Sequence, residues 1–157
     1  FTYTDENGKE QYPIMGCYGI GVGRMAASIC EVRHDDYGPI WPITIAPWQV
    51  HLCCLRSDDA ECKEKADEIY ETLQNMGIEV IYDDRKARPG AMFADADLLG
   101  VPVRVVVSPR NLAENVVEIS TRDKSIDKQK TPVDQAVTEV QNIINKLTAD
   151  INSKVNK

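Results

Sequence analysis

The chain lacks any long hydrophobic stretch. Its 157 residues contain no apolar run close to the roughly 20 that a membrane-spanning helix needs. Residues 1–5 carry neither the basic segment nor the apolar segment of a secretory signal peptide. An initiator methionine is also absent, so we expect a piece of a longer chain. These absences argue against a membrane or secreted protein and predict a cytoplasmic one.

Patterns for zinc binding and nucleophilic catalysis are also missing. The five cysteines include no Cys-x-x-Cys pair and the two histidines lie far apart, so the sequence predicts no zinc site. Reduced thiols are expected, as in a cytosolic protein. The serines fall at expected helix starts or on polar strands, and neither His34 nor His51 has an obvious partner for a triad. A nucleophilic hydrolase is therefore not supported.

The chain has fewer basic than acidic residues. The chain has 18 lysines and arginines against 25 acidic residues, which gives a formal net charge of −7. A non-specific nucleic-acid binder normally carries a basic field, so this balance argues against that class. A local basic patch that binds one structured RNA remains compatible with it.

A glycine-rich stretch dominates the first part of the chain. Residues 1–15 are expected to form a β-hairpin about Asn7-Gly8, a favoured tight-turn pair. In residues 19–23, Gly-Ile-Gly-Val-Gly, a strand would place all three glycines on one face and let a flat group approach closely. A strand packed tightly under a helix would explain the same pattern. Residues 25–30 are expected to form a buried helix.

Prolines at residues 39, 42 and 47 suggest a domain boundary, and alternating strand and helix patterns follow. The order β-α-β-α-β-β-β-α over about residues 46–150 predicts an α/β domain of three layers, a central mixed five-stranded sheet flanked by helices. Ser57-Asp58 is expected to cap its first helix, and Thr131-Pro132 to begin its last. A small hairpin, strand and helix piece would precede this domain.

A cluster of opposite charges interrupts this pattern between Val80 and Pro102. Residues 83–88, Asp-Asp-Arg-Lys-Ala-Arg, follow an apolar strand, and a helical pattern begins at Pro89 and stops at Gly100. The end of a strand beside the start of a helix is a common ligand position in α/β sheets. The acidic side chains could hold Mg²⁺, or the cluster could be solvated and internally paired.

The charged cluster also suits guanine. One carboxylate can accept both donors of the Watson–Crick edge, and an arginine can donate to O6 and N7. The loop supplies both groups, and single-stranded RNA is recognised on these edges with bases stacked on aromatic side chains. Phe93 could stack a base, although its place on the apolar helix face favours a core role.

The sequence resembles the C-terminal part of prolyl-tRNA synthetases of the bacterial type, which belong to class II. Residues 15–24, MGCYGIGVGR, are similar to the family's form of motif 3, and residues 40–50 and 83–95 to its hinge and anticodon-binding domain. The resemblance covers nearly the whole chain. It implies a catalytic-domain tip over 1–40, an anticodon-binding domain over 41–150 and a polar tail over 151–157.

The family joins proline to its tRNA with ATP through a prolyl-adenylate. The resemblance therefore implies a catalytic site near Cys17 and Arg24, with ATP contacts from Gly19, Gly21, Gly23 and Arg24. It also implies that the tRNA anticodon, with its two guanines, is bound by Asp83, Asp84, Arg85, Arg88, Phe93 and Asp97. The full-length enzyme would be a homodimer that uses proline, ATP and Mg²⁺, with none of these bound to this piece.

Two departures from the family pattern matter. Asp97 stands where the family usually has Glu, and the shorter acid puts that contact in doubt. Motifs 1 and 2 are absent, so this chain alone is expected to be inactive. The alternative function is a non-catalytic tRNA- or protein-binding module built on the same domain, although such an adaptor would not need motif 3. Neither DNA nor a membrane is an expected partner.

Overall fold

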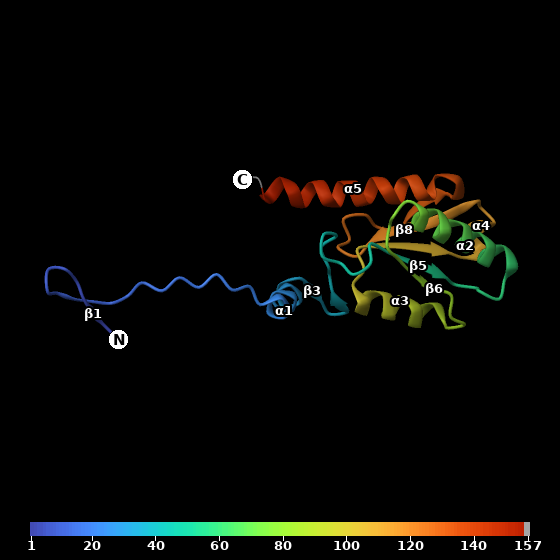
Figure 1. Ribbon diagram of the computed structural model, residues 1–157. Coiled ribbons are helices and arrows are strands. Elements are labelled where there is room, and N and C mark those ends of the chain that lie inside the picture. Colours follow the sequence, from blue (N-terminus) through green and yellow to red (C-terminus); the bar gives the residue numbers. More distant parts are fainter. Residues whose placement is uncertain (156–157) are drawn as a thin grey trace.

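The computed structural model describes residues 1–155, which form an extended N-terminal arm and an α/β body (Figure 1). A hairpin of β1 (Tyr3–Thr4) and β2 (Glu10–Gln11) lies at the far end of the arm. Gly8 adopts φ 74° in its turn, a left-handed conformation that glycine adopts without steric cost. The predicted hairpin about Asn7-Gly8 is therefore confirmed.

The glycine-rich stretch differs from the prediction. Residues 12–21 are extended but pair with no strand in the part of the chain that the structure describes, and Ile14 and Tyr18 are almost fully exposed. Helix α1 (Val22–Val32) begins before Gly23, and none of its described residues is buried. The expected strand through Gly23 is wrong, and the helix expected over residues 25–30 is present but not buried, because no described strand pairs with this segment or covers the helix.

The body is built on a five-stranded sheet with the order β6-β5-β7-β8-β9. The strands β6, β5 and β7 run parallel to one another. Strand β8 pairs antiparallel with β7, and β9 pairs antiparallel with β8. This confirms the predicted mixed sheet. The strands are β5 (Val50–Cys54), β6 (Val80–Asp83), β7 (Val103–Val107), β8 (Val116–Thr121) and β9 (Gln129–Pro132).

Helices cover both faces of this sheet, as Figure 1 shows. Helices α2 (Ala60–Asn75) and α5 (Ala136–Val155) lie on one face, and α3 (Pro89–Leu99) lies on the other. A short helix, α4 (Pro109–Leu112), follows β7. Within residues 1–155, no helix combines the length and apolarity needed to cross a membrane.

The two faces of the sheet bury cores of different size. The larger core packs α2 and α5 against Leu52, Cys54 and their neighbours, and the smaller one packs Met92 of α3 against Cys53 and Val106. The adjacent cysteines therefore point to opposite faces, as strand periodicity predicts. The smaller core covers only part of the α3 face of the sheet, so the rest of this face can make other contacts.

Two predicted helix starts are wrong. Helix α2 is capped by Asp59, whose carboxylate accepts from the backbone N–H of Cys62 at 2.9 Å, because Asp58 is bonded to Arg56 instead. Thr131 does not cap α5. It lies in β9, where it pairs with Val117, and a 3₁₀ turn η1 (Val133–Gln135) leads into α5.

A second hairpin joins the arm to the body. Its strands are β3 (His34–Asp35) and β4 (Gly38–Pro39), and β4 packs against α3. Gly38 and Gly100 permit this contact, since a Cβ on either would lie within 3 Å of backbone atoms of the other element. The first residues of the proline-rich boundary are thus fastened to the end of α3.

Candidate functional site

The charged loop after β6 is held by internal ion pairs. Arg85 donates to both carboxylate oxygens of Asp83 at 2.8 Å and to Asp95 of α3 at 2.7 Å. Hydrogen bonds from Arg85 hold the pKa of the buried Asp83 below its usual value. The Asp83 carboxylate stays ionised at neutral pH, and the hydrogen bonds from Arg85 fasten the loop to α3. Asp84 and Arg88 remain exposed beside these pairs.

Phe93 and Asp97 lie further along α3. Phe93 packs partly against the small core, and the guanidinium of Arg104 on β7 lies 5.8 Å from its ring centroid. Arg104 also donates to Asp97. The ring is therefore a half-buried aromatic surface with a cation already stacked on it, a combination that suits nucleobase stacking.

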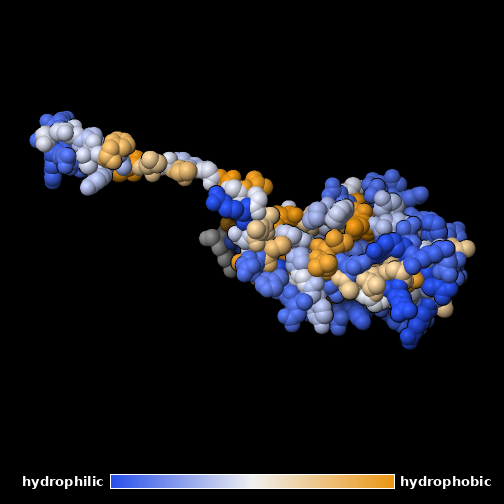
Figure 2. Space-filling model, turned by 90° about the horizontal axis from the view of Figure 1, so that it is seen from below, coloured by the Kyte–Doolittle hydropathy of each residue, from blue (hydrophilic) through white to orange (hydrophobic). Residues whose placement is uncertain are grey.

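A cavity of about 340 Å³ opens beside Phe93 on the α3 side of the sheet. Its lining carries three cationic side chains and one carboxylate, which are Arg110, Lys128, Lys130 and Glu118. A neighbouring hollow of about 170 Å³ shares Lys128 and adds Arg104 and Lys124. Figure 2 views the molecule from this side, where apolar surface in the middle of the face is bordered by hydrophilic surface. The arrangement offers stacking surface, cations and an acceptor in one place.

Sequence reasoning missed most of the residues that line this cavity. They come from β7, α4, β8, β9 and the turn before β9, and only the folded sheet brings these elements together. Two signals were available. Arg104 is the only charged residue in an otherwise apolar strand, and the alternation of β8 places Glu118 and Ser120 on one face.

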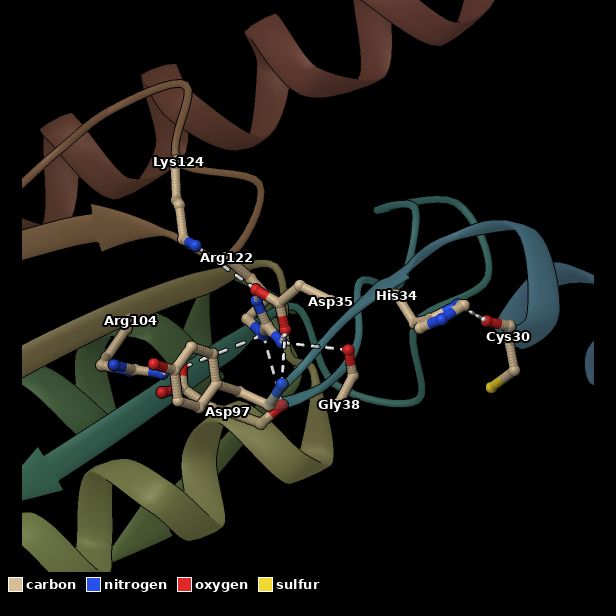
Figure 3. A network of polar contacts seen from close by, with 9 residues as sticks. Cys30, His34, Asp35, Gly38, Asp97, Arg104, Arg122 and Lys124 are labelled. Carbon is tan, nitrogen blue, oxygen red and sulfur yellow. Dashed lines mark hydrogen bonds and ion pairs between the residues drawn. The ribbon is translucent and has the colours of Figure 1, made fainter.

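A buried arginine ties this surface to the β3–β4 hairpin (Figure 3). The side chain of Arg122 is 3% exposed and donates to the two carboxylate oxygens of Asp35 at 2.9 and 2.6 Å. It also donates to the carbonyl oxygens of Gly38 at 3.1 Å and Asp97 at 3.2 Å. The arginine strongly lowers the pKa of Asp35. One guanidinium therefore connects the hairpin, the end of α3 and the end of β8.

The residues expected near ATP lie elsewhere. Cys17, Gly19 and Gly21 are exposed on the arm, and Gly23 and Arg24 are exposed in the first turn of α1. Figure 1 shows that the arm leads away from the sheet, so these residues form no site with the charged loop. Among residues 1–155, no group of three or more possible metal ligands is brought together.

His51 makes the unfolding free energy depend on pH. Burial of this imidazole on β5 lowers its pKa to about 4. An unfolded histidine titrates near pH ~6.5, so below that pH the unfolded chain binds a proton that the folded chain does not bind until about pH 4. The free energy of unfolding should therefore fall by roughly 2–3 kcal/mol from this residue alone as pH drops from ~6.5 to ~4.

Urea denaturation at about pH 7 and pH 4.5 tests this. His51→Gln should lose less free energy of unfolding between the two pH values than the parent chain. His34→Gln, at an exposed position, is the matched control and should behave as the parent does. Equal losses in all three proteins would contradict the expectation.

The mixed five-stranded sheet with helices on both faces is the fold of an α/β domain. The family described as "Anticodon binding domain" matches residues 49–143, and the chain belongs to it. Within that family, the chain is homologous to the C-terminal region of prolyl-tRNA synthetases. The expected fold class and the expected family are thus confirmed.

Individual relatives show how much of a synthetase the chain represents. It is 45% identical over 141 residues to the proline–tRNA ligase of Syntrophus aciditrophicus, covering 88% of this chain and 24% of that protein. It is 41% identical over 155 residues to that of Brachyspira hyodysenteriae, covering 99% and 27%. The chain therefore spans about a quarter of the length of these curated relatives.

A solved structure shares the fold. The prolyl-tRNA synthetase from Cryptosporidium parvum, crystallised with L-proline and AMP, matches 99% of this chain with a TM-score of 0.72, over 34% of its own length. The sequence identity is 20%, so this match concerns the fold alone.

Proposed function

We propose that this chain is the part of a proline–tRNA ligase that binds the anticodon and recognises its two guanines. The observation that carries the proposal is the cavity beside Phe93, with three cations and one carboxylate in its lining. A carboxylate can accept both donors of a guanine Watson–Crick edge, and a guanidinium can donate to its O6 and N7. Phe93 offers a face on which a base can stack.

The proposal gives the charged loop two roles. Arg85 is engaged by Asp83 and Asp95, so these three residues position the loop on α3. Asp84 and Arg88 are exposed and available for direct contact with RNA. Asp97 positions Arg104 beside Phe93. The ion pairs of Arg85 thus fix the position of the loop that carries Asp84 and Arg88.

Activation of proline belongs to the whole protein in this proposal. The guanidinium of Arg24 could contact ATP phosphates, and the glycines of residues 19–23 would allow the nucleotide to approach the backbone closely. These residues lie on an exposed arm and enclose no nucleotide site by themselves. The proposal therefore assigns ATP, Mg²⁺ and dimer formation to the full-length ligase, and RNA binding to this chain.

Binding of anticodon stem-loops tests the proposal by fluorescence anisotropy at fixed salt. The chain should bind a proline anticodon stem-loop more tightly than one in which both guanines are replaced. Arg88→Ala, Asp84→Ala and Arg110→Ala should each cost about 1–3 kcal/mol of binding free energy where the side chain contacts a base. Arg56→Ala is the control, since Arg56 is exposed and paired with Asp58.

The pattern of losses separates the kinds of contact. A base contact weakens binding of the native stem-loop only, whereas a phosphate contact weakens both stem-loops alike. Equal affinity of the parent chain for the native and the guanine-replaced stem-loops would overturn the recognition role.

A further inference from the structure

A second cavity lies at the opposite edge of the sheet. It has a volume of about 300 Å³ and is bounded by β6 and the last turns of α3. It shares no lining residue with the cavity beside Phe93, and β5 and β7 separate β6 from β8 in the sheet. Its walls include Ile81, Leu98 and Leu99, and Leu98 is 64% exposed. The proposed anticodon contacts therefore leave this cavity unused.

An imidazole without hydrogen bonds lines the cavity. The side chain of His51 is 2% exposed, and neither ring nitrogen has a hydrogen-bond partner among residues 1–155. Burial keeps the ring neutral at physiological pH, so it offers one donor and one acceptor. Buried polar groups are nearly always satisfied, and a group left without a partner is costly. The two ring nitrogens point in divergent directions, so a ligand in this cavity could supply one of the two missing bonds.

The charged side chains at the rim of the cavity determine which ligand charge is favoured. Asp83, Arg85 and Asp95 all line it, and together they carry one net negative charge. Both oxygens of Asp83 accept from Arg85, but the bond from Arg85 to Asp95 uses only Oδ2. The Oδ1 atom of Asp95 is thus an acceptor at the rim. An anion would be repelled here, and a ligand with N–H donors would be attracted.

We propose that this cavity is a binding site for a flat heteroaromatic amine, neutral or singly positive. The aliphatic walls pack against the ring, and a ring N–H or ring nitrogen of the ligand makes one hydrogen bond to the imidazole of His51. A further amine N–H donates to Asp95. Phosphates and carboxylates are excluded by the charge of the rim. The site shares the positioning residues Asp83, Arg85 and Asp95 with the charged loop, but none of its lining residues with the cavity beside Phe93.

Nuclear magnetic resonance of histidine-labelled protein tests the site, with 2-aminobenzimidazole as the probe. The chain has two histidines, so the exposed His34 serves as an internal reference. The ring nitrogen signals of His51 should shift with the probe and saturate, with a Kd of about 1 mM, as expected for a ligand of this size. Benzimidazole-2-carboxylate, which has the same ring and a negative charge, should leave these signals unchanged.

Matched variants locate the binding. Leu98→Ser removes an exposed wall and should weaken the probe about tenfold, and Asp95→Asn should weaken it severalfold. Met76→Ser is the control, because Met76 is 48% exposed and lies outside the cavity. Asp95→Asn keeps the test valid if the leucine variant does not fold. The proposal is overturned if the His51 signals show no saturable shift, or if the control weakens binding as much as Leu98→Ser.

Discussion

Replacing Arg122 by methionine is expected to lower the free energy of unfolding by about 3–5 kcal/mol. The arginine is 3% exposed, and its removal takes the donor from two carbonyl oxygens and leaves the Asp35 carboxylate with only Lys124 and the backbone N–H of Tyr37. Breaking one partner of a buried pair is costly because the remaining charge stays desolvated. Chemical denaturation in urea measures the loss as a lower midpoint.

The chain offers a matched control for this substitution. Arg56 also pairs with an aspartate through two hydrogen bonds, but its side chain is 60% exposed. Arg56→Met should therefore cost less than about 1 kcal/mol. If the two variants lose similar stability, burial is not what makes the Arg122 pair important.

A double variant tests whether Asp35 and Arg122 stabilise the fold as a pair. The double variant Asp35→Asn with Arg122→Met should lose less stability than the sum of the two single variants, because the amide leaves no uncompensated charge. Hydrogen exchange should also rise in β3 and β4 in each single variant. Additive losses would indicate that the two side chains act independently, contrary to their bonds at 2.6 and 2.9 Å.

We expect Gly100→Ala to lower the free energy of unfolding by about 3 kcal/mol, which makes it the second substitution with a large effect. Gly100 ends α3 at φ 69°, where an alanine is strained. A Cβ at this position would also collide with the carbonyl oxygen of Pro39, so the β3–β4 hairpin would have to move. Thermal or urea unfolding measures the loss.

Gly77 provides the comparison that separates strain from close contact. It follows α2 at φ 77°, but a Cβ there would meet no atom within 4 Å. Gly77→Ala should therefore cost only about 1 kcal/mol, the cost of the left-handed conformation. Equal losses at the two glycines would show that packing against Pro39 contributes nothing.

The α/β body could be predicted because its signals are local. Apolar residues along α2 repeat at helical spacing, and β7 is apolar apart from Arg104 because it lies inside the sheet. The glycine-rich stretch could not be predicted in the same way. Alternation alone indicates a strand, but a strand forms only where a partner is present to accept its hydrogen bonds.

The candidate site was predictable only in part. The charges of residues 83–88 marked the right region of the sheet, and Phe93 does lie at a cavity. That Arg85 is engaged by Asp83 and Asp95 could not be predicted, because charge spacing does not show which acid an arginine meets. The ring of His51 looked unremarkable in the sequence, since burial is a property of its neighbours.

The main strands and helices of the α/β body, its mixed sheet and the family of the chain could be predicted from the sequence, because these depend on periodicity and on long matching segments. Which charges meet depends on the folded chain. Arg122 is 87 residues from Asp35 along the chain, and Lys128 and Lys130 line the same cavity as Phe93 although they lie far from it in sequence. Such contacts depend on strand order and register, which place distant side chains on the same face.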